Sequence, residues 1–102
     1  MYCASFIFTP GDYDEEFNRL NTAIDTYAKS LNGYIRVDSW QSISGDERNS
    51  MYYFKDLESI KKLADLPAHQ KAKSKVDNWY EDYRIEIFEI IESYGKDSPK
   101  KF

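Results

Sequence analysis

The order in which strand-like and helix-like segments follow one another most constrains how these 102 residues can fold. Runs rich in aromatic and β-branched residues predict strands at 2–9, 34–43, 49–54 and 83–91. Apolar residues at helical spacing predict one helix over about 13–31, and a second helix from Asp56 that Pro67 divides into two segments. The order βαββαβ predicts an α+β, ferredoxin-like sandwich, in which an antiparallel four-stranded sheet carries two helices on one face.

Local signals place the ends and faces of these elements. Asp12 is expected to cap the first helix, which Asn32-Gly33 would end. In the strand at 34–43, alternation puts one set of side chains on one face and a second set on the other. The first set is Ile35, Val37 and Ile43, and the second is Tyr34, Arg36, Asp38 and Trp40.

A chain of this length predicts one domain, over 1–95, followed by a polar C-terminal tail at 96–102. Nine Tyr, six Phe and two Trp are more rings than a core of this size usually holds, so some are expected to line a pocket or a subunit interface. Rings on both faces of the sheet would leave one face uncovered in a monomer. We therefore expect a homodimer that pairs through its sheet faces.

The charge and the cysteine content limit which binding partners and which cellular compartment the sequence predicts. Fourteen basic residues against 18 acidic ones give a net charge of −4, and the strand sequence SMYYF lacks the basic, glycine and aromatic pattern of an RNA-binding sheet. Nucleic acid is therefore not an expected partner. A single cysteine, the absence of a signal-peptide pattern in MYCASFIF and the lack of a long apolar run predict a cytoplasmic protein that has no membrane partner.

The sequence offers no pattern for a metal or a cofactor. His69 is the only histidine and Cys3 the only cysteine, and 66 positions separate them. The four glycines stand at element boundaries rather than in a phosphate-binding loop. We expect no metal, flavin or haem, and we expect Cys3 to be a core residue rather than a nucleophile.

His69 and a group of rings are the candidate functional residues. Imidazole titrates near neutral pH, so His69 is the candidate catalytic residue for proton transfer, and the alternative is a structural histidine at a helix start. Trp40, Tyr52, Trp79 and Tyr83 are the candidate substrate-binding residues, with Tyr80 beside them, and the alternative is that these rings only fill the core.

Residues Gly33 to Tyr94 resemble the antibiotic biosynthesis monooxygenase family of dimeric α/β barrels. The similarity lies in GYIRVDSWQSIS, followed by MYYFKDLESIKKLADLPAHQKAKSKVDNWYEDYRIEIFEIIESYG. The positions that carry it fall in the family's order. They are Gly33-Tyr34, Asp38 and Trp40, Phe54 with Asp56, then Leu66, His69 and Ala72, then Asp82-Tyr83-Arg84 and Tyr94-Gly95.

This resemblance implies two ferredoxin-like protomers joined by their sheets, each with a cavity between sheet and helices. Some members oxidise aromatic polyketide phenols with O₂ and no metal or flavin, and others degrade haem. Phe54 and Leu63 stand where many members have tryptophan. Ala4 and Lys73 stand where the haem-degrading branch has asparagine and a second histidine, which disfavours haem cleavage.

The sequence supports two candidate functions. The first is a cofactor-independent, monooxygenase-like protein that acts on a small aromatic or quinol-type molecule with O₂. The second is a noncatalytic, small-ligand-binding or structural dimer of the same fold. A polar pocket beside His69 would favour the first, and an interior filled by Trp40, Phe54 and Trp79 would favour the second.

Overall fold

The computed structural model describes residues 1–96, and it confirms the predicted order of strands and helices. The predicted polar tail lies outside these residues except for Lys96. No helix among the described residues is both long and apolar enough to cross a membrane. The elements are β1 (Tyr2–Pro10), α1 (Glu15–Ser30), β2 (Tyr34–Gln41), β3 (Arg48–Phe54), α2 (Leu57–Asp65), α3 (Pro67–Lys73), α4 (Val76–Trp79) and β4 (Tyr80–Glu89).

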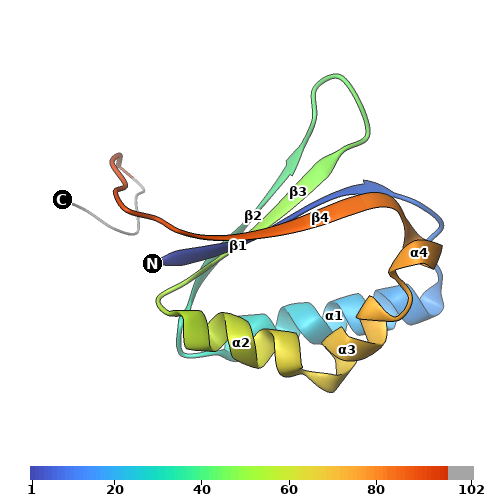
Figure 1. Ribbon diagram of the computed structural model, residues 1–102, viewed down its shortest axis with the longest axis horizontal. Helices are drawn as coiled ribbons and strands as arrows, with labels where there is room; N and C mark the ends of the chain where they lie inside the picture. Colours follow the sequence, from blue (N-terminus) through green and yellow to red (C-terminus); the bar gives the residue numbers. More distant parts are fainter. Residues whose placement is uncertain (97–102) are drawn as a thin grey trace.

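The strands form one antiparallel sheet in the order β2-β3-β1-β4. Figure 1 shows the helices together below this sheet, while the β2–β3 hairpin rises away from them. This arrangement confirms the ferredoxin-like α+β sandwich. We call the sheet face that packs on the helices the helix side, and the opposite face the open face.

Side-chain caps fix the starts of the two longer helices. The Asp14 carboxylate accepts a hydrogen bond from the Phe17 N–H (2.8 Å), so Asp14 caps α1 and the prediction of Asp12 was wrong by two residues. Asp56 caps α2 in the same way through the Ser59 N–H (2.9 Å). Pro67 occupies the first turn of α3, which confirms the predicted division of the second helix.

The core lies between the helix side of the sheet and the helices. Its buried centre consists of Ala28, Phe54, Ile60 and Leu63, from α1, β3 and α2. Tyr2 and Ala4 of β1 pack against this centre, as does Tyr52 of β3. Because neighbouring residues on a strand face opposite ways, Cys3 and Ser5 lie on the open face, where both are nevertheless buried.

A bulge in β2 changes which residues share a face. The register with β3 shifts between Tyr34 and Arg36, so Ile35 is an extra residue in β2. Arg36, Asp38 and Trp40 lie together on the open face as predicted. Tyr34 packs on the core instead, so its predicted place with those three was wrong.

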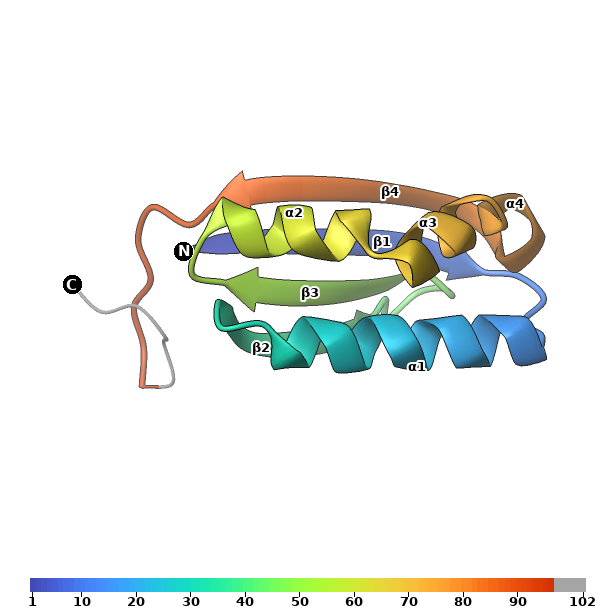
Figure 2. The same ribbon diagram turned by 90° about the horizontal axis from the view of Figure 1, so that it is seen from below.

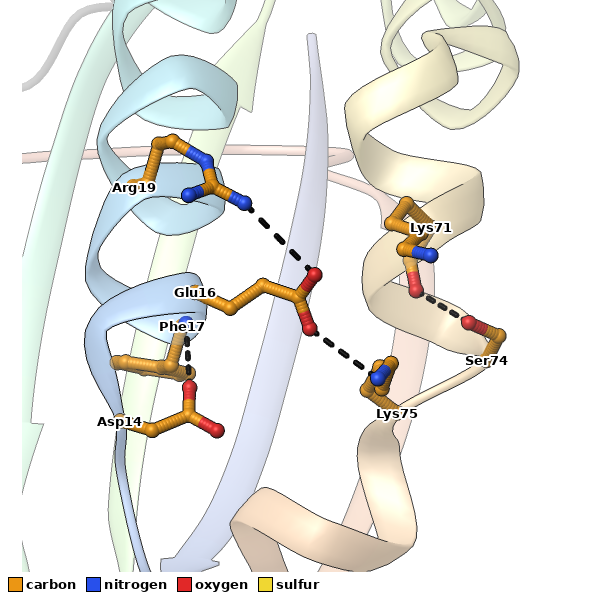
Figure 3. A network of polar contacts seen from close by, with 7 residues as sticks. All are labelled: Asp14, Glu16, Phe17, Arg19, Lys71, Ser74 and Lys75. Atoms are coloured by element: carbon orange, nitrogen blue, oxygen red, sulfur yellow. Dashed lines mark hydrogen bonds and ion pairs between the residues drawn. The ribbon is translucent and has the colours of Figure 1, made fainter.

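The last strand begins at Tyr80, three residues before the predicted start, because α4 is a single turn that ends at Trp79. Two contacts hold this helical turn against the rest of the chain. The Gly11 N–H donates to the Trp79 carbonyl (2.7 Å). Figure 3 shows the second contact, the ion pair between Lys75 and Glu16 of α1 (3.2 Å). A Cβ on Gly11 would lie 2.9 Å from that carbonyl oxygen, so this close approach requires glycine.

Candidate functional site

Aromatic rings gather at the end of the sheet where β4 begins. Phe6 and Phe8 of β1 stack on each other with centroids 4.9 Å apart, and Tyr80 meets both edge-on at 5.1 and 5.2 Å. Tyr83 lies 6.1 Å from Phe6 and 6.4 Å from Tyr80. We call Phe6, Phe8, Tyr80 and Tyr83 the aromatic cluster.

A second group of rings continues the aromatic cluster toward α1. Tyr13 stacks face to face on Phe17 (3.8 Å), and Phe17 meets Trp79 edge-on (5.3 Å). Burial raises the pKa of Tyr80, and Tyr13 adds to that shift, so the Tyr80 hydroxyl stays protonated at neutral pH. The site therefore offers ring faces and a neutral phenol rather than charge.

The aromatic cluster borders an apolar row on the helix side of β4. The row consists of Tyr83, Ile85 and Ile87, whose relative exposures are 43, 50 and 52%. The register with Phe8, Phe6 and Ala4 places these three side chains on the helix side. Figure 2 shows β4 at the outer edge of the sheet, with α2 lying over the inner strands. This row is accessible apolar surface next to rings, which suits a flat organic molecule.

Tyr52 lies on the same sheet face, but its hydroxyl already has a partner. It donates to the Asp25 carboxylate of α1 (2.7 Å), which also pairs with Lys29 (2.9 Å). Burial raises the pKa of Tyr52, and the hydrogen bond to Asp25 raises it further. Burial opposes the ionisation of Asp25, yet the bonds from Tyr52 and Lys29 outweigh it and lower the pKa of Asp25. Tyr52 thus links sheet to helix.

His69 stands in the first turns of α3, which packs on α1 and α2. Its side chain is half-buried, and Nδ1 is buried without a hydrogen-bond partner among the described residues. Burial lowers the pKa of His69, and the positive charge of Lys73 lowers it further, while the Ala64 carbonyl partly offsets both. The imidazole is therefore uncharged at neutral pH and able to accept a proton.

The structure brings together only part of the predicted site. Tyr83 belongs to the aromatic cluster, and Trp79 joins it through Phe17 but is almost fully buried. Trp40 lies on the open face with 62% of its surface exposed, across the sheet from Tyr52 and Tyr83. Within residues 1–96, no hydrogen bond or ring contact joins His69 to these rings.

Several residues of the site were missed from sequence. Phe6 and Phe8 alternate in β1, which is the signal that could have placed both on one sheet face with Tyr83. Asp25 gave no such signal, because its contact with Tyr52 joins residues 27 positions apart in a helix and a strand.

His69 lines neither of two cavities that lie on residues 1–96. One of about 380 Å³ lies where α1 ends and α2 begins, between Gly33, Asp56 and Lys62. The other, of about 130 Å³, opens on β1 and β4. Its walls are Ile7, Phe8, Thr9, Glu47, Asp82, Tyr83 and Arg84.

The described residues contain no group of three His, Cys, Asp or Glu side chains that could hold a metal ion. Cys3 is fully buried, as expected of a core residue. Burial, aided by Asp38, raises the pKa of its thiol to about 11, so the reactive thiolate is scarce at neutral pH.

Comparison with solved structures identifies proteins of the same architecture. SnoaB, a cofactor-independent oxygenase from Streptomyces nogalater, superposes with a TM-score of 0.71 at 10% identity, over 93% of this chain and 97% of that one. The chain has the fold of the antibiotic biosynthesis monooxygenases. A putative member from Deinococcus radiodurans gives a TM-score of 0.67 at 14% identity, over 96% of this chain and 100% of its own.

A dabb family protein with a ferredoxin-like fold from Mesorhizobium loti gives a TM-score of 0.62 at 14% identity, over 88% of this chain and 96% of that one. No protein-family model matches the chain, and no curated protein matches it in sequence. At these identities the similarity is one of fold. It confirms the predicted architecture and the resemblance to the monooxygenase fold, but it gives no information about the substrate.

The protonation state of His69 can be read directly, because the chain has one histidine. We expect its imidazole proton resonances to titrate below the usual pKa of about 6.5. Lys73→Ala should move that pKa upward by removing a like charge, whereas Lys55→Ala, on the β3–α2 connection, should not. A titration by proton NMR checks this, and a pKa at or above 6.5 in the unmodified protein would contradict it.

Tyr52→Phe should lower the free energy of unfolding by about 1–2 kcal/mol, because it leaves a charged acceptor short of one hydrogen bond. Since the pKa of Asp25 is lowered in the fold, its stabilisation is present above the unfolded pKa and is lost as pH falls through the folded value. The variant should therefore lose stability at a higher pH than the unmodified protein.

Urea unfolding at several pH values measures both effects. Tyr53→Phe is the matched control, because the Tyr53 hydroxyl lies on the open face beside Arg36 and the Met51 sulfur (3.9 Å), and it has no bond to a carboxylate that joins sheet to helix. Equal losses from the two variants would show that the bond to Asp25 adds no stability.

Proposed function

We propose that this chain is a cofactor-independent, monooxygenase-like protein that acts on a small aromatic or quinol-type molecule with O₂. The observation that carries the proposal is the aromatic cluster, which borders the accessible row Tyr83, Ile85 and Ile87. Flat rings bind well against such a surface. The fold shared with SnoaB over nearly the whole chain supports the same reaction class.

The chemistry needs no cofactor because the substrate supplies the electrons. A phenol that loses its proton can reduce O₂, and combination of the resulting radicals forms a C–O bond. Loss of water then leaves a quinone, so that one phenol and one O₂ give one quinone and one H₂O. The protein has to bind the ring, accept the phenolic proton and limit the access of water. His69, held neutral by burial, is the proposed proton acceptor, and Tyr83 contacts the ring.

A second candidate is a noncatalytic, ligand-binding or structural protein of the same fold. Phe54 and Trp79 fill the space between sheet and helices, at 0 and 2% exposure, and neither described cavity includes His69. A binding protein would use the same apolar row on β4 without proton transfer. The two candidates therefore differ in turnover and not in the surface that binds.

The proposal includes a homodimer formed through the open faces. On that face Phe88 is 40% exposed and Trp40 is still more exposed, although ion pairs and buried polar groups lie between them. Two neighbouring residues of β4 lie on opposite faces of the sheet, so substitutions at these two positions can test the dimer. Phe88 pairs with Cys3 on the open face, whereas Ile87 pairs with Ala4 on the helix side.

We expect sedimentation at micromolar concentration to show a species of twice 12.1 kDa. Phe88→Asp should give a soluble monomer, because an unpaired charge buried in the interface costs several kcal/mol. Ile87→Asp should leave the dimer intact, since its side chain lies on the other face. A 12.1 kDa species from the unmodified protein would refute the sheet-face dimer.

For activity, O₂ consumption should be measured with a panel of hydroquinones and polycyclic phenols. His69→Gln should lower turnover at least about a hundredfold, the lower end of what general-base catalysis contributes. Gln70→Ala, an exposed neighbour on α3, should change turnover less than threefold. An active His69→Gln variant would remove His69 from catalysis. Quenching of the intrinsic protein fluorescence by ligand without O₂ consumption would favour the noncatalytic candidate.

A further inference from the structure

Arg48 differs from the other arginines of the chain in having no carboxylate partner. The other three each form an ion pair, Arg19 with Glu16, Arg36 with Asp38 and Arg84 with Glu86. Within residues 1–96, no carboxylate pairs with Arg48, whose side chain is exposed. Its charge is therefore available to an anion from outside the chain.

Arg48 belongs to a row of residues on the helix side that crosses the sheet at the aromatic cluster. The register places Arg48 opposite Phe8 of β1, and Phe8 opposite Tyr83 of β4. On its other side, Arg48 lies opposite Gln41 of β2. Directly opposite residues of antiparallel strands share one face, so the row contains an amide, a guanidinium and two rings in that order. Because neighbouring strands lie about 4.8 Å apart, about 10 Å separates Arg48 from Tyr83 along the row.

Two tyrosines extend the ring surface next to Arg48. Tyr80 meets Phe8 edge-on (5.2 Å), and Tyr13 meets Tyr80 edge-on (6.0 Å). Burial raises the pKa of Tyr13, and the positive charge of Arg48 partly opposes that rise. The field of the guanidinium therefore reaches a phenol at the border of the aromatic cluster. Since Tyr13 and Tyr83 are 39 and 43% exposed, a molecule from solution can reach the rings and the charge together.

We propose that Arg48 binds the carboxylate of an aromatic acid whose rings lie against Phe8 and Tyr83. The planar guanidinium of arginine matches a carboxylate through two parallel N–H···O bonds. The amide of Gln41, next in the row, can donate a further hydrogen bond to the same group. A length of about 10 Å between Arg48 and Tyr83 suits an acid with two fused rings. The inference rests on the binding surface of the proposed function and adds that the substrate is an anion.

A second arginine lies near the same end of the sheet in different surroundings. Arg84 is opposite Ile7 on the open face, and its guanidinium already pairs with Glu86 (3.6 Å). The cavity of about 130 Å³ beside it also has Glu47 and Asp82 in its walls. These carboxylates repel an anion. The surroundings of Arg84 therefore disfavour an aromatic acid, and this residue provides a matched control.

Binding of naphthoate and of its uncharged amide, naphthamide, tests the proposal without requiring turnover. Isothermal titration calorimetry gives the Kd of each compound. Arg48→Gln should raise the Kd of naphthoate at least about fivefold, a limited effect because solvent screens an exposed arginine. The same change should alter the Kd of naphthamide less than about twofold, since the amide carries no charge. Added salt should weaken the binding of naphthoate to the unmodified protein and leave that of naphthamide unchanged.

Arg84→Gln should change the Kd of naphthoate less than about twofold. Thermal melts by circular dichroism should show that both variants stay folded, because both arginine side chains are exposed. The Arg48 site is wrong if naphthoate does not bind, if it binds no better than naphthamide, or if Arg48→Gln leaves its Kd unchanged.

The outcome for the anion site is separate from the outcome for the oxygenase activity. If naphthoate binding depends on Arg48 and no phenol in the panel consumes O₂, the site stands and the activity is wrong. If phenols are oxidised and Arg48→Gln leaves naphthoate binding unchanged, the activity stands and the site is wrong.

Discussion

The alternation of β1 is the constraint on which both sides of the sheet depend. β1 is an inner strand, with β3 on one side and β4 on the other, so its two faces define the two faces of the sheet. One face presents Tyr2, Ala4, Phe6 and Phe8 to the helices, and the other presents Cys3, Ser5, Ile7 and Thr9. Shifting the register of such a strand by one residue would exchange the aromatic side for the small and polar side. The core and the proposed subunit contact therefore rely on the same nine residues.

Much of the architecture could be predicted from sequence because its signals are local. Strand-like alternation, a proline at the start of a helix and Asp56 ahead of an apolar helical pattern each report on a few adjacent residues. The predictions were wrong where contacts with distant parts of the chain determine the local structure. Both Asp12 and Asp14 have the chemistry of a cap, and the path of the chain from β1 into α1 selects Asp14. The bulge at Ile35 similarly moves Tyr34 to the core side without a sequence signal of its own.

The candidate site was predictable in its residue types and less so in its arrangement. A single histidine and an excess of rings identify the groups that could perform chemistry. Their positions depend on pairings between distant segments, such as Tyr83 with Phe8 or Tyr52 with Asp25. Burial then decides how they behave, since it holds His69 neutral and keeps the Tyr80 hydroxyl protonated. A pattern along the chain cannot report burial of this kind, because it depends on which helix covers which part of the sheet.

The pairing of the first strand with the last has a consequence for how the molecule forms. β1 is made well before one of its two neighbours, β4, which consists of residues 80–89. During synthesis on the ribosome, the inner strand therefore lacks that neighbour until these residues have been made. Contacts between residues so far apart in sequence raise the contact order, which slows folding relative to a helical protein of similar size. Until β4 arrives, one edge of β1 is open to any other extended chain, so the exposed half of the sheet is the part of the nascent protein most prone to mispairing.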